Sequence, residues 1–431
     1  MTNPRYAKSQ AMFERASRVI PLGSQTFSKS HLSYPEGEAP LFLSHGRGAR
    51  VWDVDGNEYV DLVNGLLPNV LGYDDPDVTR AVVDQLGKGV TLSLATELEV
   101  KLAEELVRLI PCAEMVRFGK NGSDVTAGAI RVARAFTGRD HVAVCGYHGW
   151  QDWYVGCTLR NKGVPQAVRE LTHSFPYNDL PALEALLTGL PGQFCAVIME
   201  PMNFVEPVPG YLVGVKELAH RHGALFILDE IITGFRYHIG GAQTLLGVTP
   251  DLATFGKSMG NGFPVAALVG RADIMREMED IFFSFTFGGE GVSLAAALSV
   301  VEKMQREPVI ERLWETGNKL IGSINGLIRE YDLSQTVSLV GKPCWSLMQL
   351  ADAGGYTSWE LKTLFLQEAL ENGVLTGGAN NICFAHDSDD LALVEAAYRV
   401  GLSKIKAVLD GEPLAGHLRC PAIQPIFRVR G

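Results

Sequence analysis

Residues 223–230, GALFILDE, indicate the fold of the middle of the chain. They form a short apolar run that ends in two carboxylates, which is typical of a strand buried on both faces of a parallel sheet. HVAVCG (141–146) and FCAVIMEP (194–201) have the same form. Helical patterns separate the runs, among them an apolar stripe over residues 125–136 that ends before Gly138. This alternation predicts a wound α/β domain with a mainly parallel sheet.

The length of the chain and the change in its sequence pattern predict the domain organisation. A chain of 431 residues has room for two or three domains. We expect residues 61–310 to form a large domain, and residues 1–60 and 311–431 to form a smaller α+β domain. Within the first segment, ARVWDVDGNEYV (49–60) places Asp-Gly-Asn between two apolar-rich runs and predicts a β-hairpin.

Composition excludes several classes of function. The net charge of −11 disfavours a nucleic-acid partner, whose phosphates would be repelled. The seven cysteines include no C-x-x-C pair, so a disulfide framework and a zinc site are both disfavoured, and no other metal site is predicted. No apolar run approaches the roughly 18–20 residues that span a membrane. We therefore expect a soluble, cytoplasmic protein.

The first candidate for chemistry is Asp229, at the carboxyl end of the predicted strand 223–230. Ligands of open parallel sheets bind outside the carboxyl ends of the strands. The alternative is that Asp229 caps the next helix or pairs with an arginine. The neighbouring Glu230 fits either role.

The second candidate is Lys257, in PDLATFGKSMGNGFP (250–264). A lysine in a dry pocket loses its charge readily and becomes a nucleophile toward aldehydes. Glycines around it let a flat cofactor approach the backbone. The alternative is a surface lysine in a glycine-rich turn. A nucleotide-binding P-loop is excluded, because that motif requires glycine at position 251, which is Asp251.

Two further segments contain polar groups at strand ends. Asn121, Gly122 and Ser123 precede the predicted helix, where backbone N–H groups and a hydroxyl can bind a phosphate. The alternative is a helix N-cap without a ligand. Tyr147 and His148 follow the strand HVAVC, where an aromatic ring can lie against a flat ligand. His148 fits an acid–base role, or it is an ordinary loop histidine.

In this order, the segments resemble the class III aminotransferases of pyridoxal 5′-phosphate (PLP) fold type I. The similarity is to the glutamate-1-semialdehyde aminomutase-like branch and extends from about residue 15 to about residue 405. Its most specific parts are LDEIITGFR (228–236) and PDLATFGKSMGNGFPVAALVGR (250–271). The spacing from Asp229 to Lys257, 257 − 229 = 28 residues, is the one that this family requires.

The resemblance implies a role for each residue around the PLP ring. The domain 61–310 would bind PLP, with Lys257 attached to it as a Schiff base. Asp229 would keep the pyridine nitrogen protonated, so that the ring acts as an electron sink. Once displaced by a substrate amine, Lys257 would move the proton at the substrate's Cα. Tyr147 would stack on one face of the ring, Ile231 would press on the other, and Glu200 would lie near the phenolic oxygen.

The resemblance also implies the phosphate contacts and a partner. Residues 121–123, called the phosphate turn below, would bind the phosphate. His148 would also contribute to binding the cofactor. In FFSFTFGGEG (282–291), Thr286 matches the position that reaches the phosphate of a second subunit, which implies a homodimer with shared active sites. Gly-Glu-Gly stands there in place of the more frequent Gly-Asn-Pro, and the role of Glu290 is left open.

Departures from the family pattern concern the substrate. Lys29 stands where the aminomutase has a carboxylate-binding arginine, and Leu66 stands where it has a tryptophan. Lysine lacks the bidentate fork of arginine, so carboxylate recognition would be looser. The phosphate turn reads KNGSD rather than the commoner NSGTE. No arginine near the C-terminus offers a clamp for an α-carboxylate. Asn380, Asn381 and His386 are either polar substrate contacts or loop residues.

These departures favour a PLP-dependent aminotransferase that moves an amino group from a donor of the glutamate class. The acceptor would be an aldehyde or keto group of a small metabolite, for example a sugar or secondary-metabolite intermediate. An intramolecular aminomutase is the alternative. A PLP-fold binding protein that has lost catalysis is a third hypothesis, which intact Lys257, Asp229 and Tyr147 disfavour. A nicotinamide oxidoreductase is a poorer fit, because no G-x-G-x-x-G follows a strand.

Overall fold

The computed structural model describes residues 3–425. This part of the chain divides into two compact units. Unit 1 consists of residues 3–66, 71–75 and 311–425, and unit 2 of residues 67–70 and 76–310. Among the described residues, no helix is both long enough and apolar enough to cross a membrane.

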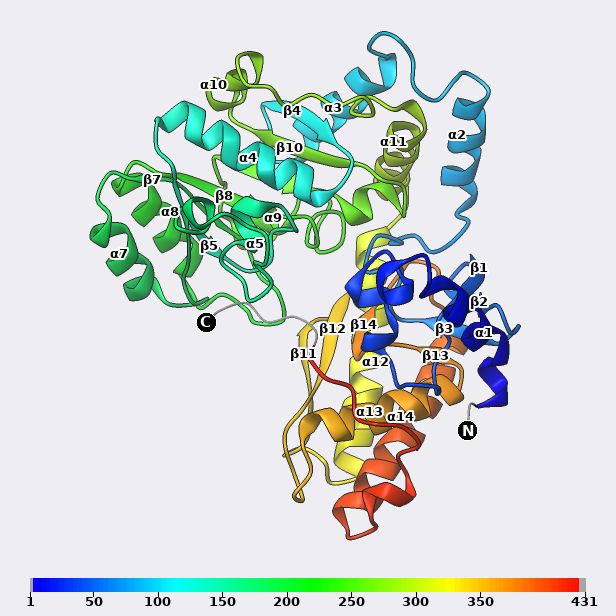
Figure 1. The fold of residues 1–431 in the computed structure, drawn as a ribbon. Coiled ribbons are helices and arrows are strands. Elements are labelled where there is room, and N and C mark those ends of the chain that lie inside the picture. The colour runs from blue at the N-terminus through cyan, green and yellow to red at the C-terminus, as the bar shows by residue number, and fades with distance from the viewer. Residues whose placement is uncertain (1–2, 426–431) are drawn as a thin grey trace. The chain divides into compact units, whose positions relative to one another are not determined.

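Unit 2 is built on a seven-stranded sheet with the strand order β4-β10-β9-β8-β7-β5-β6 (Figure 1). The strands are β4 (Met115–Gly119), β5 (His141–Cys145), β6 (Thr172–Ser174), β7 (Phe194–Met199), β8 (Leu225–Asp229), β9 (Leu252–Phe255) and β10 (Ala266–Gly270). The pairs from β9 to β6 are parallel, and β10 is antiparallel to both of its neighbours. The expectation of a mainly parallel sheet is confirmed.

Both faces of this sheet are buried, as the apolar runs predict. Along β8, Leu225 and Ile227 belong to one apolar cluster, whereas Phe226 and Leu228 belong to another. Side chains alternate between the faces of a strand, so the two clusters lie on opposite faces. Helix α4 packs in the first cluster, and helices α7 and α8 pack in the second (Figure 1).

The helices of unit 2 come mostly from its connections. They are α2 (Pro76–Leu86), α3 (Glu97–Leu109), α4 (Gly122–Thr137), α5 (Asp152–Val155), α6 (Gln166–Arg169), α7 (Leu180–Gly189), α8 (Tyr211–Arg221), α9 (Ala242–Leu246), α10 (Ala272–Met275) and α11 (Gly291–Arg306). Helix α4 has the predicted apolar stripe and ends at Gly138, whose φ of 65° is in the left-handed region. Only glycine adopts this conformation without strain, which explains why the helix stops there.

Unit 1 contains two small sheets, with the strand orders β1-β2-β3-β13 and β11-β12-β14. Its strands are β1 (Leu43–Arg47), β2 (Arg50–Asp53), β3 (Glu58–Asp61), β11 (Val337–Lys342), β12 (Trp345–Leu350), β13 (Val374–Leu375) and β14 (Ala379–Asn381). Its helices are α1 (Ala7–Ala16), α12 (Val309–Glu330, which begins in unit 2), α13 (Ser358–Glu371) and α14 (Ser388–Leu409). The predicted hairpin is confirmed, because β2 and β3 are antiparallel neighbours.

Candidate active site

The carboxyl ends of β7 and β8 bring two carboxylates to one edge of the sheet of unit 2. Glu200 follows the last residue of β7, and Asp229 is the last residue of β8. The two strands are parallel neighbours, with Met199 paired to Leu228. Both carboxylates act on the Lys257 amine, so the three groups share one neighbourhood, as the sequence predicts.

Asp229 is held by hydrogen bonds to both of its oxygens. His148 Nδ1 lies 2.8 Å from Oδ2. The Ile231 N–H and the Thr254 hydroxyl each donate to Oδ1 over 3.2 Å. Both side chains of the His148–Asp229 pair are almost fully buried. The direction of the carboxylate is therefore fixed by its neighbours.

His148 also has a second partner, which restricts its tautomer. Its Nε2 lies 3.2 Å from the Cys145 carbonyl oxygen. A carbonyl oxygen only accepts hydrogen bonds, so Nε2 carries a hydrogen when this bond forms. The contact between Nδ1 and Asp229 Oδ2 then shares one further proton. His148 is thus a positioning partner of Asp229 and not an ordinary loop histidine.

Lys257 begins a short 3-10 helix, Lys257–Gly260, directly after β9. Its φ of 41° is in the left-handed region, which costs about 1–3 kcal/mol for a residue other than glycine and is common at functional sites. Burial lowers the pKa of its amine, and the charges of Glu200 and Asp229 oppose that change. An amine that is easily neutral is a better nucleophile, so the surface-lysine alternative is disfavoured.

Glu200 is fixed by the turn after β5. The Tyr147 N–H donates to its Oε2 over 3.1 Å. A Cβ at Gly146, whose φ is 106°, would collide with the same carboxylate, so glycine is needed there. Burial raises the pKa of Glu200, and the nearby charge of Asp229 raises it further, whereas His148 and Lys257 lower it. Glu200 is therefore electrostatically coupled to the group around Lys257.

The phosphate turn is an N-cap, and it is also open to a ligand. Asn121 caps α4 by accepting from the Ser123 N–H, and the capping box is completed by Asp124. Ser123 Oγ accepts from the Trp150 N–H over 3.2 Å. A Cβ at Gly122 would lie 2.6 Å from Ile231 Cδ1. The turn and Ile231 are thus in close contact, with an N-terminal helix end that favours an anion.

Tyr147 and Glu230 differ in whether a ligand could contact them. Tyr147 is 51 % exposed, and its ring lies edge-on to Tyr154 with the centroids 5.7 Å apart. Glu230 is fully buried and accepts from the N–H groups of Ala242 and Gln243 at the start of α9. Glu230 therefore caps α9, and Asp229 alone of the two carboxylates faces the site.

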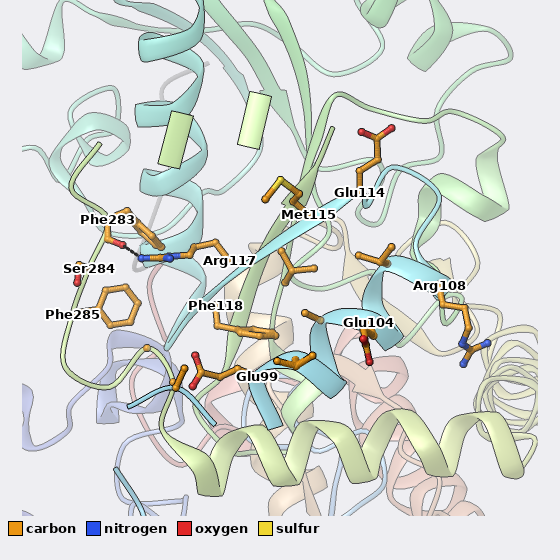
Figure 2. A pocket seen from close by; sticks show the side chains of 17 residues that line it. Glu99, Glu104, Arg108, Glu114, Met115, Arg117, Phe118, Phe283, Ser284 and Phe285 are labelled. Carbon is orange, nitrogen blue, oxygen red and sulfur yellow. Dashed lines mark hydrogen bonds between the residues drawn. The ribbon is translucent and has the colours of Figure 1, made fainter. Parts of the chain in front are cut away.

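Thr286 is exposed and lies in unit 2 on residues 281–290, called the Thr286 loop below. Its start is anchored by Arg131 and Arg117, which donate to the carbonyl oxygens of Phe282 and Phe283 over 2.6 Å and 2.9 Å. The Arg117 contact borders a cavity of about 730 Å³ between β4, α3 and this loop (Figure 2).

The predicted substrate residues Lys29 and Leu66 belong to unit 1. Lys29 is exposed, and its charge lowers the pKa of Asp61, although burial raises that pKa overall. Leu66 has a φ of 78° and lines a cavity of unit 1.

The three C-terminal polar candidates are all buried in unit 1. Asn380 accepts from the Tyr398 hydroxyl over 2.8 Å and lies in β14 rather than in a loop. His386 Nδ1 accepts from the Cys383 N–H over 2.9 Å. Asn380 and His386 therefore have structural contacts, whereas Asn381 lines the same cavity as Leu66.

Three features of the candidate active site are not predicted from the sequence. Thr254 binds Asp229 from the neighbouring strand β9, and nothing in the apolar run marks it in advance. Arg236 is fully buried, donates to the Leu67 carbonyl oxygen over 2.9 Å and lowers the pKa of Lys257. Its position at the end of the TGFR motif (233–236) could have identified it from the sequence. The third is an ion pair between Lys120 and Glu290, at 2.9 Å.

The comparisons with known proteins agree with this geometry. Residues 33–408 match the family described as aminotransferase class-III. The chain belongs to the class III aminotransferases. It is 37 % identical over 417 residues to the 3-aminobutyryl-CoA aminotransferase of Cloacimonas acidaminovorans (strain Evry), covering 94 % of this chain and 99 % of that protein.

Two further relatives are similar over almost their whole length. The glutamate-1-semialdehyde 2,1-aminomutase of Syntrophomonas wolfei subsp. wolfei is 34 % identical over 421 residues, covering 90 % of this chain and 96 % of that protein. The PLP internal aldimine form of the FumI protein of Sphingopyxis sp. MTA144 superposes with a TM-score of 0.87 at 27 % identity, covering 95 % and 99 %. The fold-type-I prediction is thereby confirmed.

Membership of the family makes the protein a PLP-dependent enzyme with aminotransferase or aminomutase activity. The residues present fit this cofactor. A nucleophilic amine, a fixed carboxylate and a helix N-terminus occur together in unit 2, and a side chain at Gly122 or Gly149 would intrude on Ile231 or on Ser123.

Proposed function

We propose that the chain is an intermolecular aminotransferase that uses an amino donor of the glutamate class. The acceptor would be an aldehyde or keto group of a small metabolite. The observation that carries the proposal is the environment of the Lys257 amine, whose pKa is lowered by burial beside Glu200 and Asp229. The preference for transfer between two molecules rests on Lys29 and Leu66, which replace the arginine and tryptophan of the aminomutase pattern.

When bound, PLP supplies an electron sink that stabilises negative charge at the Cα of an amino substrate. Lys257 would anchor the cofactor and, once released, hold or return the proton at that carbon. Asp229, fixed by His148 and Thr254, would keep the ring nitrogen protonated. The buried setting strengthens this charge contact, because little water competes with it.

The remaining residues would orient the ring. Tyr147 presents a half-exposed aromatic face, and Ile231 supplies an apolar contact. The N–H groups of the phosphate turn and the Ser123 hydroxyl would bind the phosphate. Glu200, held by the Tyr147 N–H, would lie near the phenolic oxygen. Lys29 and Leu66 are proposed to contact the substrate.

We also propose a homodimer in which Thr286 reaches the phosphate of the partner. Phe282 is 81 % exposed, and Phe287, Leu92 and Leu94 are exposed as well. With the cavity of Figure 2, they give unit 2 an apolar surface larger than single surface residues explain. A second copy that buries this surface would place Thr286, at the tip of its loop, against a neighbouring site. The cytoplasmic location stays a prediction.

The dimer is tested by sedimentation. Phe287→Asp should lower the mass toward that of a monomer, whereas Val19→Asp, at an even more exposed apolar residue of unit 1, should not. Thr286→Ala should leave the dimer intact and weaken PLP binding. A monomeric wild type, or a Thr286→Ala variant with unchanged PLP affinity, would contradict the proposal.

The cofactor and the reaction are tested separately. The purified protein should have an absorption band in the visible-violet region that Lys257→Ala lacks. A glutamate-class donor supplied without acceptor should release its keto acid in an amount equal to the active sites. Turnover with a panel of aldehydes should then depend on the donor. Conversion that proceeds equally well without any donor would favour the aminomutase, which the relative from Syntrophomonas wolfei supports.

A further inference from the structure

Unit 1 contains a cavity of about 260 Å³ that has no cofactor-binding residue in its lining, although Leu66, a proposed substrate contact, is one of its lining residues. Its lining comes from residues 28–34, from residues 62–66 after β3, from helix α13, from residues 377–381 around β14, and from residues 423–424. Most of its lining is apolar, with Leu62, Leu66 and Trp359 as examples, and the polar groups include Tyr34, Lys362 and Asn381. A small apolar pocket with a few polar groups is the usual form of a ligand site.

Lys362 is the charged group of this cavity. Its Nζ lies 5.3 Å from the centroid of the Trp359 ring. The amine also lies against backbone, because a Cβ at Gly378 would be 3.6 Å from Nζ. Within residues 3–425, the cavity lining contains no carboxylate, and burial alone lowers the pKa of this lysine. A partly buried cation without a counter-charge is costly, unless an anion comes to it.

One carboxylate of unit 1 that acts on the cavity lining, Asp61, already has hydrogen-bond donors. Asp61 acts electrostatically on Tyr34, which lines the cavity. Its oxygens accept from the Tyr73 hydroxyl over 2.6 Å and from the N–H groups of Val63 and Asn64. Asp61 is therefore committed to the turn after β3 and does not neutralise Lys362.

Asn381 supplies an independent observation. This residue is only 5 % exposed, and it lines the cavity. Nδ2 donates to the Val63 carbonyl oxygen over 2.7 Å, which fixes the orientation of the amide. Oδ1 accepts no hydrogen bond from the described residues. A buried acceptor without a donor destabilises the fold, so it points to a ligand that supplies one.

We propose that this cavity binds a small monocarboxylate, with Lys362 as its cationic contact and Asn381 Oδ1 as the acceptor for a hydrogen-bond donor beside the carboxylate. A single amine matches a single negative charge, whereas a phosphate dianion requires more donors than the lining offers. The volume suits an aliphatic or aromatic body of a few carbons, which Leu62, Leu66 and Trp359 would contact.

The test measures binding and not turnover, so its outcome does not depend on the proposed aminotransferase reaction. The probes are hexanoate and hexanamide, which have the same shape and differ in charge. Calorimetry on the full-length holoenzyme should show hexanoate binding about tenfold or more tightly than hexanamide, as for a charge-assisted contact. Lys362→Met should remove this preference. Lys319→Met, at an exposed lysine of unit 1 paired with Glu315, should keep it.

Thermal unfolding and the binding of a hydroxylated probe test the roles of Lys362 and Asn381 separately. Lys362→Met should unfold at a temperature no lower than the wild type, because it removes an unpaired charge and keeps the stem. If it does not fold, Lys362→Gln is the second variant and must lose the same preference. 2-Hydroxyhexanoate should bind a few-fold more tightly than hexanoate, and Asn381→Leu should remove that gain. A preference for hexanoate that survives in both Lys362 variants, or a wild type that binds both probes equally, would overturn the proposal.

Discussion

Lys120 Nζ lies 2.9 Å from Glu290 Oε2, and the two side chains are only 17 % and 11 % exposed. Lys120 immediately precedes the phosphate turn, and Glu290 ends the Thr286 loop. Glu290 also caps α11, accepting from the Val292 N–H over 2.7 Å. Within one chain, the pair therefore joins the phosphate turn, proposed to bind this subunit's phosphate, to the Thr286 loop, proposed to reach the phosphate of the partner. It also accounts for two departures from the family pattern, which compensate each other in charge.

Lys120→Met should weaken PLP binding about tenfold, because it leaves Glu290 largely buried without its cation. The double variant Lys120→Met/Glu290→Gln should lose less than the single one, since removing both partners costs less than removing one. Equilibrium dialysis of the cofactor measures both. A double variant whose loss equals the sum of the single losses would show that the two residues act independently.

The same pair predicts how stability depends on acid. Burial raises the pKa of Glu290, but hydrogen bonds from Ser293 and Lys120 outweigh it, so the pKa lies below its usual value of 4.5. A lowered carboxyl pKa contributes stability that is present above pH 4.5 and is lost as the pH falls through the folded-state pKa. Lys120→Met should move the acid-unfolding midpoint to higher pH, as followed by circular dichroism. Lys319→Met is the control and should move the midpoint much less, because its partner Glu315 is exposed to solvent.

Asp229→Asn should retain PLP and lower turnover by about a hundredfold or more, because a neutral amide does not hold the ring nitrogen protonated. Thr254→Val removes one of three hydrogen bonds to Asp229 and should cost much less. Cofactor content by absorption and steady-state kinetics separate binding from chemistry. Near-normal turnover in Asp229→Asn would remove the role assigned to this carboxylate.

The parts of the fold that the sequence predicts are those encoded locally. The apolar runs before Cys145, Glu200 and Asp229 have no polar position, so they fit only strands covered on both faces. Gly138 ends α4 because its backbone is left-handed. The distance of 28 residues between Asp229 and Lys257 spans one strand connection, so its pattern is visible in a single segment of sequence.

What the sequence does not predict depends on contacts across the chain. Lys120 and Glu290 are 170 residues apart, and each reads as an ordinary surface charge. Thr254 is one polar residue in a buried strand, and its role becomes visible only through its hydrogen bond to Asp229 on β8. The cavity near Lys362 is lined by five separate segments of the chain and forms only when they fold together. Substrate contacts depend on such long-range packing, so the sequence alone does not define them.

His148→Leu should lower turnover about tenfold more than His148→Asn. Leucine leaves Asp229 Oδ2 without the partner that now lies at 2.8 Å, whereas the asparagine amide can donate from a similar position. If His148 only fills space, the two variants should behave alike, or leucine should be the better one. The ratio of their kcat values at full cofactor occupancy distinguishes these cases.

Gly122→Ala should weaken PLP binding about tenfold, because the added Cβ would lie 2.6 Å from Ile231 Cδ1 at the proposed ring site. Ile231→Val removes that methyl group, so the double variant Gly122→Ala/Ile231→Val should recover part of the affinity. Gly322→Ala in α12 is the matched control, since nothing lies within 4 Å of its Cβ and alanine stabilises a helix by about 0.5–1 kcal/mol over glycine. Affinity is measured by cofactor titration of the apoenzyme. Because Gly122 has an ordinary φ, backbone strain does not explain a loss. A double variant as weak as Gly122→Ala alone would therefore mean that the phosphate turn and Ile231 do not enclose the same ligand.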